Sequence, residues 1–251
     1  MANYSIYFSP TGGTKRVADI LVNHLSGEYC EIDLCKNIDG LSLDSQDVCV
    51  VSVPSYGGRV PAIAIERLKK FSANGTRVIL NCVYGNRDWE DTLTELQDVL
   101  ESLGFVCVSA IAAVAEHSIF RQFATGRPDA QDEVQLAGYA KEIQNKLDAK
   151  EIGLLKLTGS HDTYKTYNGS DMKPEGKENC TGCGLCAKEC PVGAIDLSNL
   201  RIADKEKCIS CMRCVAVCPN QARGLDSDFL KTMGAKMEGV LGGYKNNHLF
   251  L

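Results

Sequence analysis

A cysteine pattern that occurs twice constrains this chain more than any other feature. The run CTGCGLCAKECP, which begins at Cys180, has the spacing C-x2-C-x2-C-x3-C-P, and CISCMRCVAVCP repeats that spacing twenty-eight residues later. The two runs contain eight of the thirteen cysteines. The first residues contain no export signal, and cysteines spaced this densely and regularly are typical of metal ligands rather than of a disulfide framework. The repeat also predicts a small module that arose by duplication.

The spacing resembles that of the bacterial two-cluster ferredoxins. This resemblance implies two [4Fe–4S] clusters, each held by three closely spaced cysteines of one run and the last cysteine of the other run. Soft thiolate ligands suit iron–sulfur clusters. A pair of structural zinc sites is the alternative, but zinc sites separate their cysteine pairs by a longer spacer. The expected ligand sets are Cys180, Cys183, Cys186 and Cys218 for one cluster, and Cys208, Cys211, Cys214 and Cys190 for the other.

The chain before residue 148 alternates between β-rich and helical segments. Near-continuous apolar segments such as VCVVSV suit a parallel sheet that helices cover on both faces. One connection, CKNIDGLSLDSQ, is barely long enough to contain a helix. The predicted strands are 4–8, 29–34, 48–53, 77–83 and 105–115, and apolar residues at helical intervals span 17–25, 64–71, 93–103 and 136–147.

The first predicted strand leads into the turn SPTGGT, from Ser9 to Thr14, and then directly into a helix. A helix N-terminus offers unsatisfied N–H groups and a positive dipole end, so it binds a phosphate without a cationic side chain. Ser9, Thr11 and Thr14 would add hydroxyl donors, while Gly12 and Gly13 would let the backbone curl around the oxygens. The turn matches neither the nucleoside-triphosphate loop nor the dinucleotide fingerprint, so we expect a ligand with one terminal phosphate.

This turn resembles the flavodoxin phosphate loop, Ser/Thr-x-Thr-Gly-x-Thr, at every defined position. Flavodoxins hold the FMN ring between two loops that follow the third and fourth strands of their sheet. The resemblance therefore implies that FMN contacts two further loops, each of which contains an aromatic residue and glycine. The expected contacts in these loops are Pro54, Ser55, Tyr56, Gly57, Gly58, Tyr84, Gly85, Asn86 and Trp89.

The whole chain resembles the flavodoxin and ferredoxin fusion proteins of anaerobic bacteria and archaea. The segments VYGNRDWEDTLTEL, AEHSIF and GRPDAQDE are similar to segments of that family as well. The resemblance implies a flavodoxin-like, five-stranded, parallel, doubly wound sheet joined to a small α+β two-cluster ferredoxin domain. The expected division is a flavodoxin-like FMN-binding domain at 1–148, a linker at 149–176, a ferredoxin domain at 177–226 and a tail at 227–251, to which we assign no role.

These cofactors predict electron transfer between two [4Fe–4S] clusters and FMN in an anaerobic redox pathway, because clusters carry single electrons and FMN accepts one or two. The alternative is an FMN-dependent reductase of a small substrate, in which His117 would donate a proton. An ordinary surface role for His117 is the simpler interpretation. A third hypothesis is a redox-sensing or docking protein that binds no flavin. The expected partners are redox proteins. A small-molecule electron acceptor and the formation of a homodimer are two further possibilities.

The composition argues against two classes of partner. The formal net charge is -5 and no long basic run occurs, which disfavours nucleic acid as a partner. No apolar run approaches the length that spans a membrane, so we expect no membrane association. Together with the missing export signal, this predicts a cytoplasmic protein.

Overall fold

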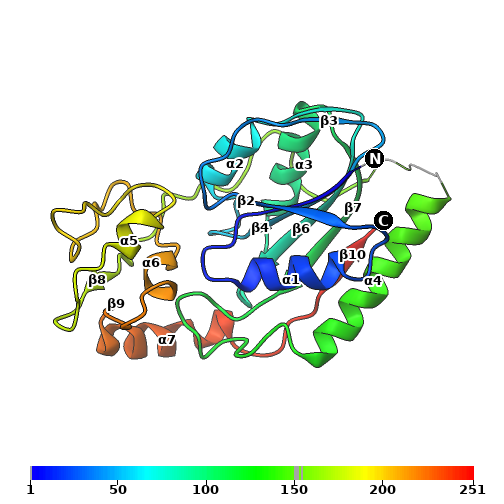
Figure 1. The fold of residues 1–251 in the computed structure, drawn as a ribbon. Coiled ribbons are helices and arrows are strands. Elements are labelled where there is room, and N and C mark those ends of the chain that lie inside the picture. The colour runs from blue at the N-terminus through cyan, green and yellow to red at the C-terminus, as the bar shows by residue number, and fades with distance from the viewer. Residues whose placement is uncertain (1, 150–152, 154) are drawn as a thin grey trace.

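Figure 1 shows the computed structural model, which describes residues 2–149, 153 and 155–251. The strands of its central sheet, among these residues, are β1 (Asn3–Tyr7), β2 (Tyr29–Asp33), β4 (Val48–Pro54), β6 (Arg77–Tyr84), β7 (Val106–Val114) and β10 (His248–Phe250). Their spatial order is β10-β7-β6-β4-β1-β2, with β10 antiparallel to β7 and the other neighbours parallel. The five parallel strands thus follow the flavodoxin-like order 2-1-3-4-5. The predicted fold class is confirmed.

Four helices of the described residues cover the two faces of this sheet, as Figure 1 shows. They are α1 (Gly13–Val22), α2 (Ala62–Leu68), α3 (Thr92–Ser102) and α4 (Ala130–Asp148). Val50 of β4 packs in one core with α1 and α4, whereas the adjacent Val51 packs in a second core with α2 and α3. Because both faces are covered, β4 is apolar throughout rather than alternating. No helix in the described part of the chain has both the length and the apolar composition that crossing a membrane requires.

The connection between β2 and β4 contains no helix among its residues, all of which the structure describes. It contains instead the short strand β3 (Ser42–Asp44), which pairs in parallel with β5 (Ser72–Asn74). The segment is too short for a helical crossover, and it forms a two-stranded sheet with β5 instead.

The cysteine-rich part forms a small module with internal two-fold similarity. It contains α5 (Leu185–Lys188) and α6 (Arg213–Ala216), and β8 (Glu175–Gly176) pairs with β9 (Arg223–Gly224). Positive φ angles recur twenty-eight residues apart, at Gly182 and Ser210, Gly184 and Met212, and Gly193 and Gln221. The duplication predicted from the sequence is therefore visible in the backbone itself.

The segment before this module is ordered against the sheet domain, without helix or strand in residues 155–174. Leu155 is buried in the core beside α3. The Lys165 N–H donates to Asp91 at 2.6 Å, and Arg59 donates to the Lys165 carbonyl at 2.8 Å. The predicted linker also includes residues 150–152 and 154, and the predicted first domain includes residue 1; these five positions lie outside the described residues.

The tail returns to the sheet domain and completes it. Helix α7 (Ser227–Leu241) begins at the side-chain cap of Asp226, passes beneath the module and reaches the sheet, where β10 adds an antiparallel edge strand (Figure 1). Asn247 accepts from the Val114 N–H at 2.8 Å and donates to Asp132 at 2.8 Å. The cysteine-rich module is therefore inserted between two parts of the sheet domain, an arrangement that the sequence did not predict.

Candidate functional site

The turn after β1 presents the N-terminal end of α1 in an arrangement that suits an anion. Gly12, the N-cap residue of α1, has a φ of +93° and makes no side-chain cap hydrogen bond. The Oγ of Ser9 accepts a hydrogen bond from the Lys15 N–H at 2.8 Å, so Ser9 fixes the turn and can still donate its own proton. The outward N–H groups and the positive dipole end fit a phosphate.

A cleft of about 370 Å³ lies where β1, β4, β6 and β7 end. This is the edge at which doubly wound sheets bind their ligands, because the loops after neighbouring parallel strands meet there. The structure brings most of the predicted FMN contacts and the candidate histidine into this one lining. These residues are Thr11, Gly13, Thr14, Pro54, Ser55, Tyr56, Gly57, Tyr84, Gly85 and His117.

Five predicted contact residues lie outside the lining of this cleft: Ser9, Gly12, Gly58, Asn86 and Trp89. The Trp89 ring lies 5.3 Å from the Tyr84 ring and 4.9 Å from the His248 ring, measured between centroids. Tyr84 also donates its hydroxyl proton to the Asn246 carbonyl at 2.7 Å, and Asn86 donates to carbonyls of the tail. Trp89 and Asn86 thus contact the tail, whereas Tyr56 and Tyr84 are the aromatic residues of the two loops that line the cleft.

The cleft has three walls that the sequence did not reveal. Tyr167 and Met172 come from the segment before the module, Ile209 and Ser210 from the second cysteine run, and Met237 from α7. Tyr167 packs on Gly57, where an added Cβ would lie 2.2 Å from the tyrosine ring. The one signal in the sequence was that Tyr164 and Tyr167 are the aromatic residues of an otherwise polar segment. A periodic sequence pattern predicts a helix or a strand, but it does not show that residues far apart in the sequence line the same site.

His117 is neutral in this site. Its Nδ1 accepts from the N–H groups of Ile119 and Phe120, each at 3.1 Å, so the ring proton lies on Nε2. Burial, and then the positive charge of Arg87, lower the pKa of His117 to about 4. At neutral pH this histidine can donate a hydrogen bond through Nε2, but it holds no extra proton to transfer.

The cysteines Cys190, Cys208, Cys211 and Cys214, here called the Cys208 set, line one apolar cavity. Burial raises the pKa of the Cys211 thiol to about 12, and the nearness of Cys214, Cys190 and Cys208 adds to this effect. Thiols in this state become ligands only when a metal displaces their protons. The four cysteines that the predicted crossed ligand set combines are thus adjacent in space, and their environment fits an iron–sulfur cluster.

The other predicted set, Cys180, Cys183, Cys186 and Cys218, is here called the Cys180 set. The loop before Cys180 is tied to the loop after Cys218, because Lys177 donates its N–H to the Ala222 carbonyl at 2.8 Å. The two runs are also matched at their fourth cysteines, since the Cys218 sulfur accepts from Ala222 N–H and the Cys190 sulfur from Ala194 N–H, both at 3.2 Å. Across the described residues, no three His, Cys, Asp or Glu side chains are grouped for a single metal ion.

Comparison with known proteins agrees with this geometry. Residues 179–223 match the sequence profile of the 4Fe-4S dicluster domain. The chain fits a flavodoxin/ferredoxin fusion. The match to a 4Fe-4S domain supports electron transfer through iron–sulfur. No curated protein sequence matches the chain significantly.

Solved structures resemble the N-terminal part. A flavodoxin from Streptococcus pneumoniae TIGR4 is 19% identical, with 58% of this chain and 99% of that chain covered at a TM-score of 0.43. Flavodoxin 2 from Bacillus cereus is 15% identical, with the same coverage and TM-score. Rubredoxin oxygen:oxidoreductase from Desulfovibrio gigas is 14% identical, with 61% of this chain and 37% of that chain covered at a TM-score of 0.39. The strand order, rather than these similarities, establishes the fold.

Proposed function

We propose that this protein transfers electrons between two [4Fe–4S] clusters and FMN that it binds in the same chain. The observation that carries this proposal is that Ile209 and Ser210, which lie between Cys208 and Cys211, form part of the lining of the FMN cleft. When bound, clusters supply one-electron carriers and FMN accepts one or two electrons. The cluster-binding loop therefore forms part of the wall of the proposed flavin cleft.

Residues of the cleft suit both ends of an FMN molecule, its phosphate and its ring. The turn with Gly12 and Gly13 at the start of α1 suits the phosphate, and Thr11 and Thr14 add hydroxyl groups. Tyr56 lies partly exposed at the cleft, in the same lining as Ile209 and Ser210 of the loop between Cys208 and Cys211.

Two contacts between the module and the sheet domain favour transfer within one chain. Arg67 of α2 donates to the carbonyl of Pro191, which follows Cys190, at 2.7 Å. Arg213, which precedes Cys214, bonds to Glu189 of the module and lies 3.9 Å from Asp33 of β2. Both contacts involve loops of the Cys208 set, so this set is next to the flavin domain. A second chain is not needed to complete the path.

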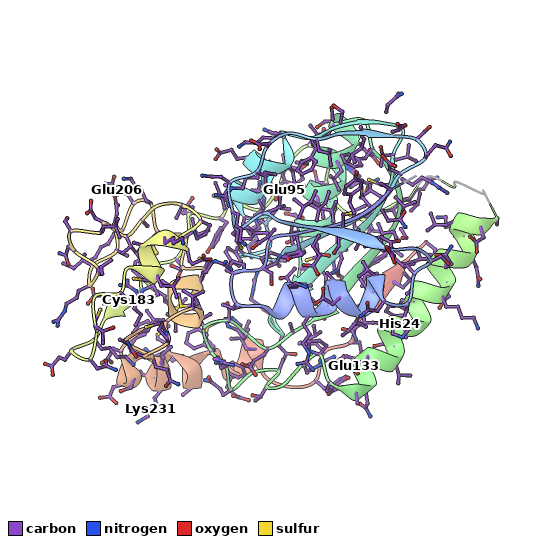
Figure 2. All side chains as sticks on the ribbon, viewed as in Figure 1. His24, Glu95, Glu133, Cys183, Glu206 and Lys231 are labelled. Carbon is purple, nitrogen blue, oxygen red and sulfur yellow. The ribbon has the colours of Figure 1, made fainter. Side chains whose placement is uncertain are left out.

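The Cys180 set suits exchange with an external redox protein. Cys183 is exposed, and Figure 2 labels it within the cysteine-rich module. The cleft, in contrast, is walled by Tyr167, Ile209 and Met237 of the same chain. We therefore place the docking of a protein partner at the Cys180 set rather than at the flavin.

The reductase alternative requires a proton donor beside the flavin. His117 lies in the cleft, but its low pKa and its occupied Nδ1 make it a hydrogen-bond donor rather than an acid at neutral pH. This arrangement gives the electron relay more support than the reductase. Reoxidation of the reduced protein that depends on an added small substrate would reverse that preference.

The proposal is tested by purifying the full chain without air and counting its cofactors. We expect one FMN, about eight iron atoms and a similar amount of sulfide per chain. A redox titration followed by visible and EPR spectra should then show flavin and clusters in equilibrium with each other. A preparation without FMN, with iron far from this number, or with centres that exchange no electrons would contradict the proposal.

A further inference from the structure

Two buried arginines near the Cys208 set have no acidic partner among the described residues. Arg67 is 5% exposed and Arg223 is 3% exposed, and neither forms a salt bridge in the described part of the chain. The other buried arginine, Arg127, pairs with Asp132. A charged group in a protein interior is costly unless an opposite charge compensates it. The unpaired state of these two side chains therefore calls for a negative group that belongs to the functional state.

Both guanidinium groups donate to carbonyls of residues that line the same cavity. Arg67 donates to the carbonyl of Pro191 at 2.7 Å, and Arg223 donates to the carbonyl of Pro174 at 2.8 Å. Pro191 and Pro174 both line the cavity of the Cys208 set. One arginine comes from α2 of the sheet domain and the other from β9 of the module. The two charges thus approach this cavity from different domains.

Arg223 also has an unused donor. Its Nε is buried and has no hydrogen-bond partner in the described structure. The other two guanidinium nitrogens donate to the carbonyls of Leu200 and Pro174, and Pro174 lines the cavity of the Cys208 set. A thiolate or sulfide at the cavity would accept the free N–H.

We propose that Arg67 and Arg223 compensate the negative charge of the cluster held by the Cys208 set and make it the more easily reduced of the two clusters. This inference rests on the proposed cluster assignment. A cluster held by four thiolates is negatively charged and gains one further negative charge on reduction, so nearby cations favour the reduced form. Electrons that enter at the exposed Cys180 set are then drawn toward the side that faces the flavin.

The duplication provides an internal comparison. The residue that corresponds to Arg223 in the first run is Ile195, twenty-eight positions earlier. Ile195 is buried in the small core that contains both Cys186 and Cys214, and it lines the cavity of the Cys208 set. The sequence therefore has a cation at this position in one half of the module and an apolar side chain in the other, which is an asymmetry between two otherwise matched halves.

The test is an anaerobic redox titration of the full-length protein, followed by EPR. The variants Arg67→Gln and Arg223→Gln remove the charge but keep a side-chain N–H donor. Each should lower the reduced-to-oxidised ratio of one cluster at least tenfold at a fixed potential, which is about 59 mV for a one-electron couple. Arg67→Lys and Arg223→Lys should restore most of that ratio. Cys211→Ser, which alters the spectrum of the Cys208 set alone, identifies the cluster that shifts.

Arg201→Leu is the matched control, because Arg201 is an exposed arginine of the same module. It should leave both cluster potentials unchanged. Potentials that stay at wild-type values in the two glutamine variants, or a shift confined to the Cys180 set, would overturn this inference while leaving the proposed relay intact. Absence of clusters from the wild-type protein would overturn both.

Discussion

At the scale of single residues, His117 shows how burial changes a predicted role. The sequence places it after the fifth strand and makes it a candidate acid, but it cannot show that two backbone N–H groups occupy Nδ1. Burial and the charge of Arg87 then hold the imidazole neutral. Environment, rather than residue type, therefore decides what this side chain can do.

The low pKa of His117 predicts a pH-dependent stability. The unfolded chain titrates near 6.5 and the folded chain near 4, so the unfolded chain binds more protons between these values. The contribution is present above pH 6.5 and is lost as pH falls toward 4, by at most about 1.4 kcal/mol per pH unit. Urea unfolding at several pH values should show that His117→Asn, whose Oδ1 can replace Nδ1 as the acceptor, lacks this part of the dependence of the unfolding free energy on pH. The control is His24→Asn, at an exposed histidine, which should keep the wild-type dependence.

Gly57 is a residue at which the cleft tolerates no side chain. Its φ is +62°, and the Tyr167 ring occupies the place of a Cβ. Gly57→Ala should displace Tyr167 and weaken FMN binding at least tenfold in a fluorescence titration. Gly126→Ala is the control, because Gly126 has a φ of +78° with no atom within 4 Å of an added Cβ. If both variants bind FMN equally well, Tyr167 has no part in the site.

At the scale of elements, the sequence predicts those parts of the fold that have a local pattern. The apolar runs and helical intervals gave the parallel strands and the helices α1 to α4, because burial imposes a period on each element. Strand β10 was not predicted, since three residues at an antiparallel edge have no period of their own. The candidate site divides in the same way. Its loops after β1, β4 and β6 follow from strand order, whereas Tyr167 and Ile209 reach it only through tertiary packing.

The tail contributes stability through Asn247, which is 3% exposed and bonds to Val114 and Asp132. Asn247→Ala would leave the Val114 N–H buried without its partner, which costs about 1–3 kcal/mol. Urea unfolding should therefore show a loss of this size. Asn246→Ala is the matched control, because Asn246 is exposed and only its backbone carbonyl accepts from Tyr84. A loss of stability in the control as large as in Asn247→Ala would contradict this role.

At the scale of the whole molecule, the cysteine-rich module is held to the sheet domain at both of its ends. Residues 155–165 contact α3 and its N-cap on one side, and α7 with β10 returns on the other (Figure 1). Arg67 adds a buried contact between the two parts, and Arg213 adds a half-buried one. A module attached in this way keeps a fixed position, in contrast to one that swings on a flexible tether.

The central claim is that electrons pass between the Cys208 set and FMN inside one chain. The most direct measurement is the rate of flavin reduction after rapid one-electron reduction of the anaerobic protein, recorded over a tenfold range of protein concentration. The account predicts a first-order rate that does not change with concentration, and a loss of this phase in Cys211→Ser. A rate that rises in proportion to concentration would show transfer between chains and would contradict the account.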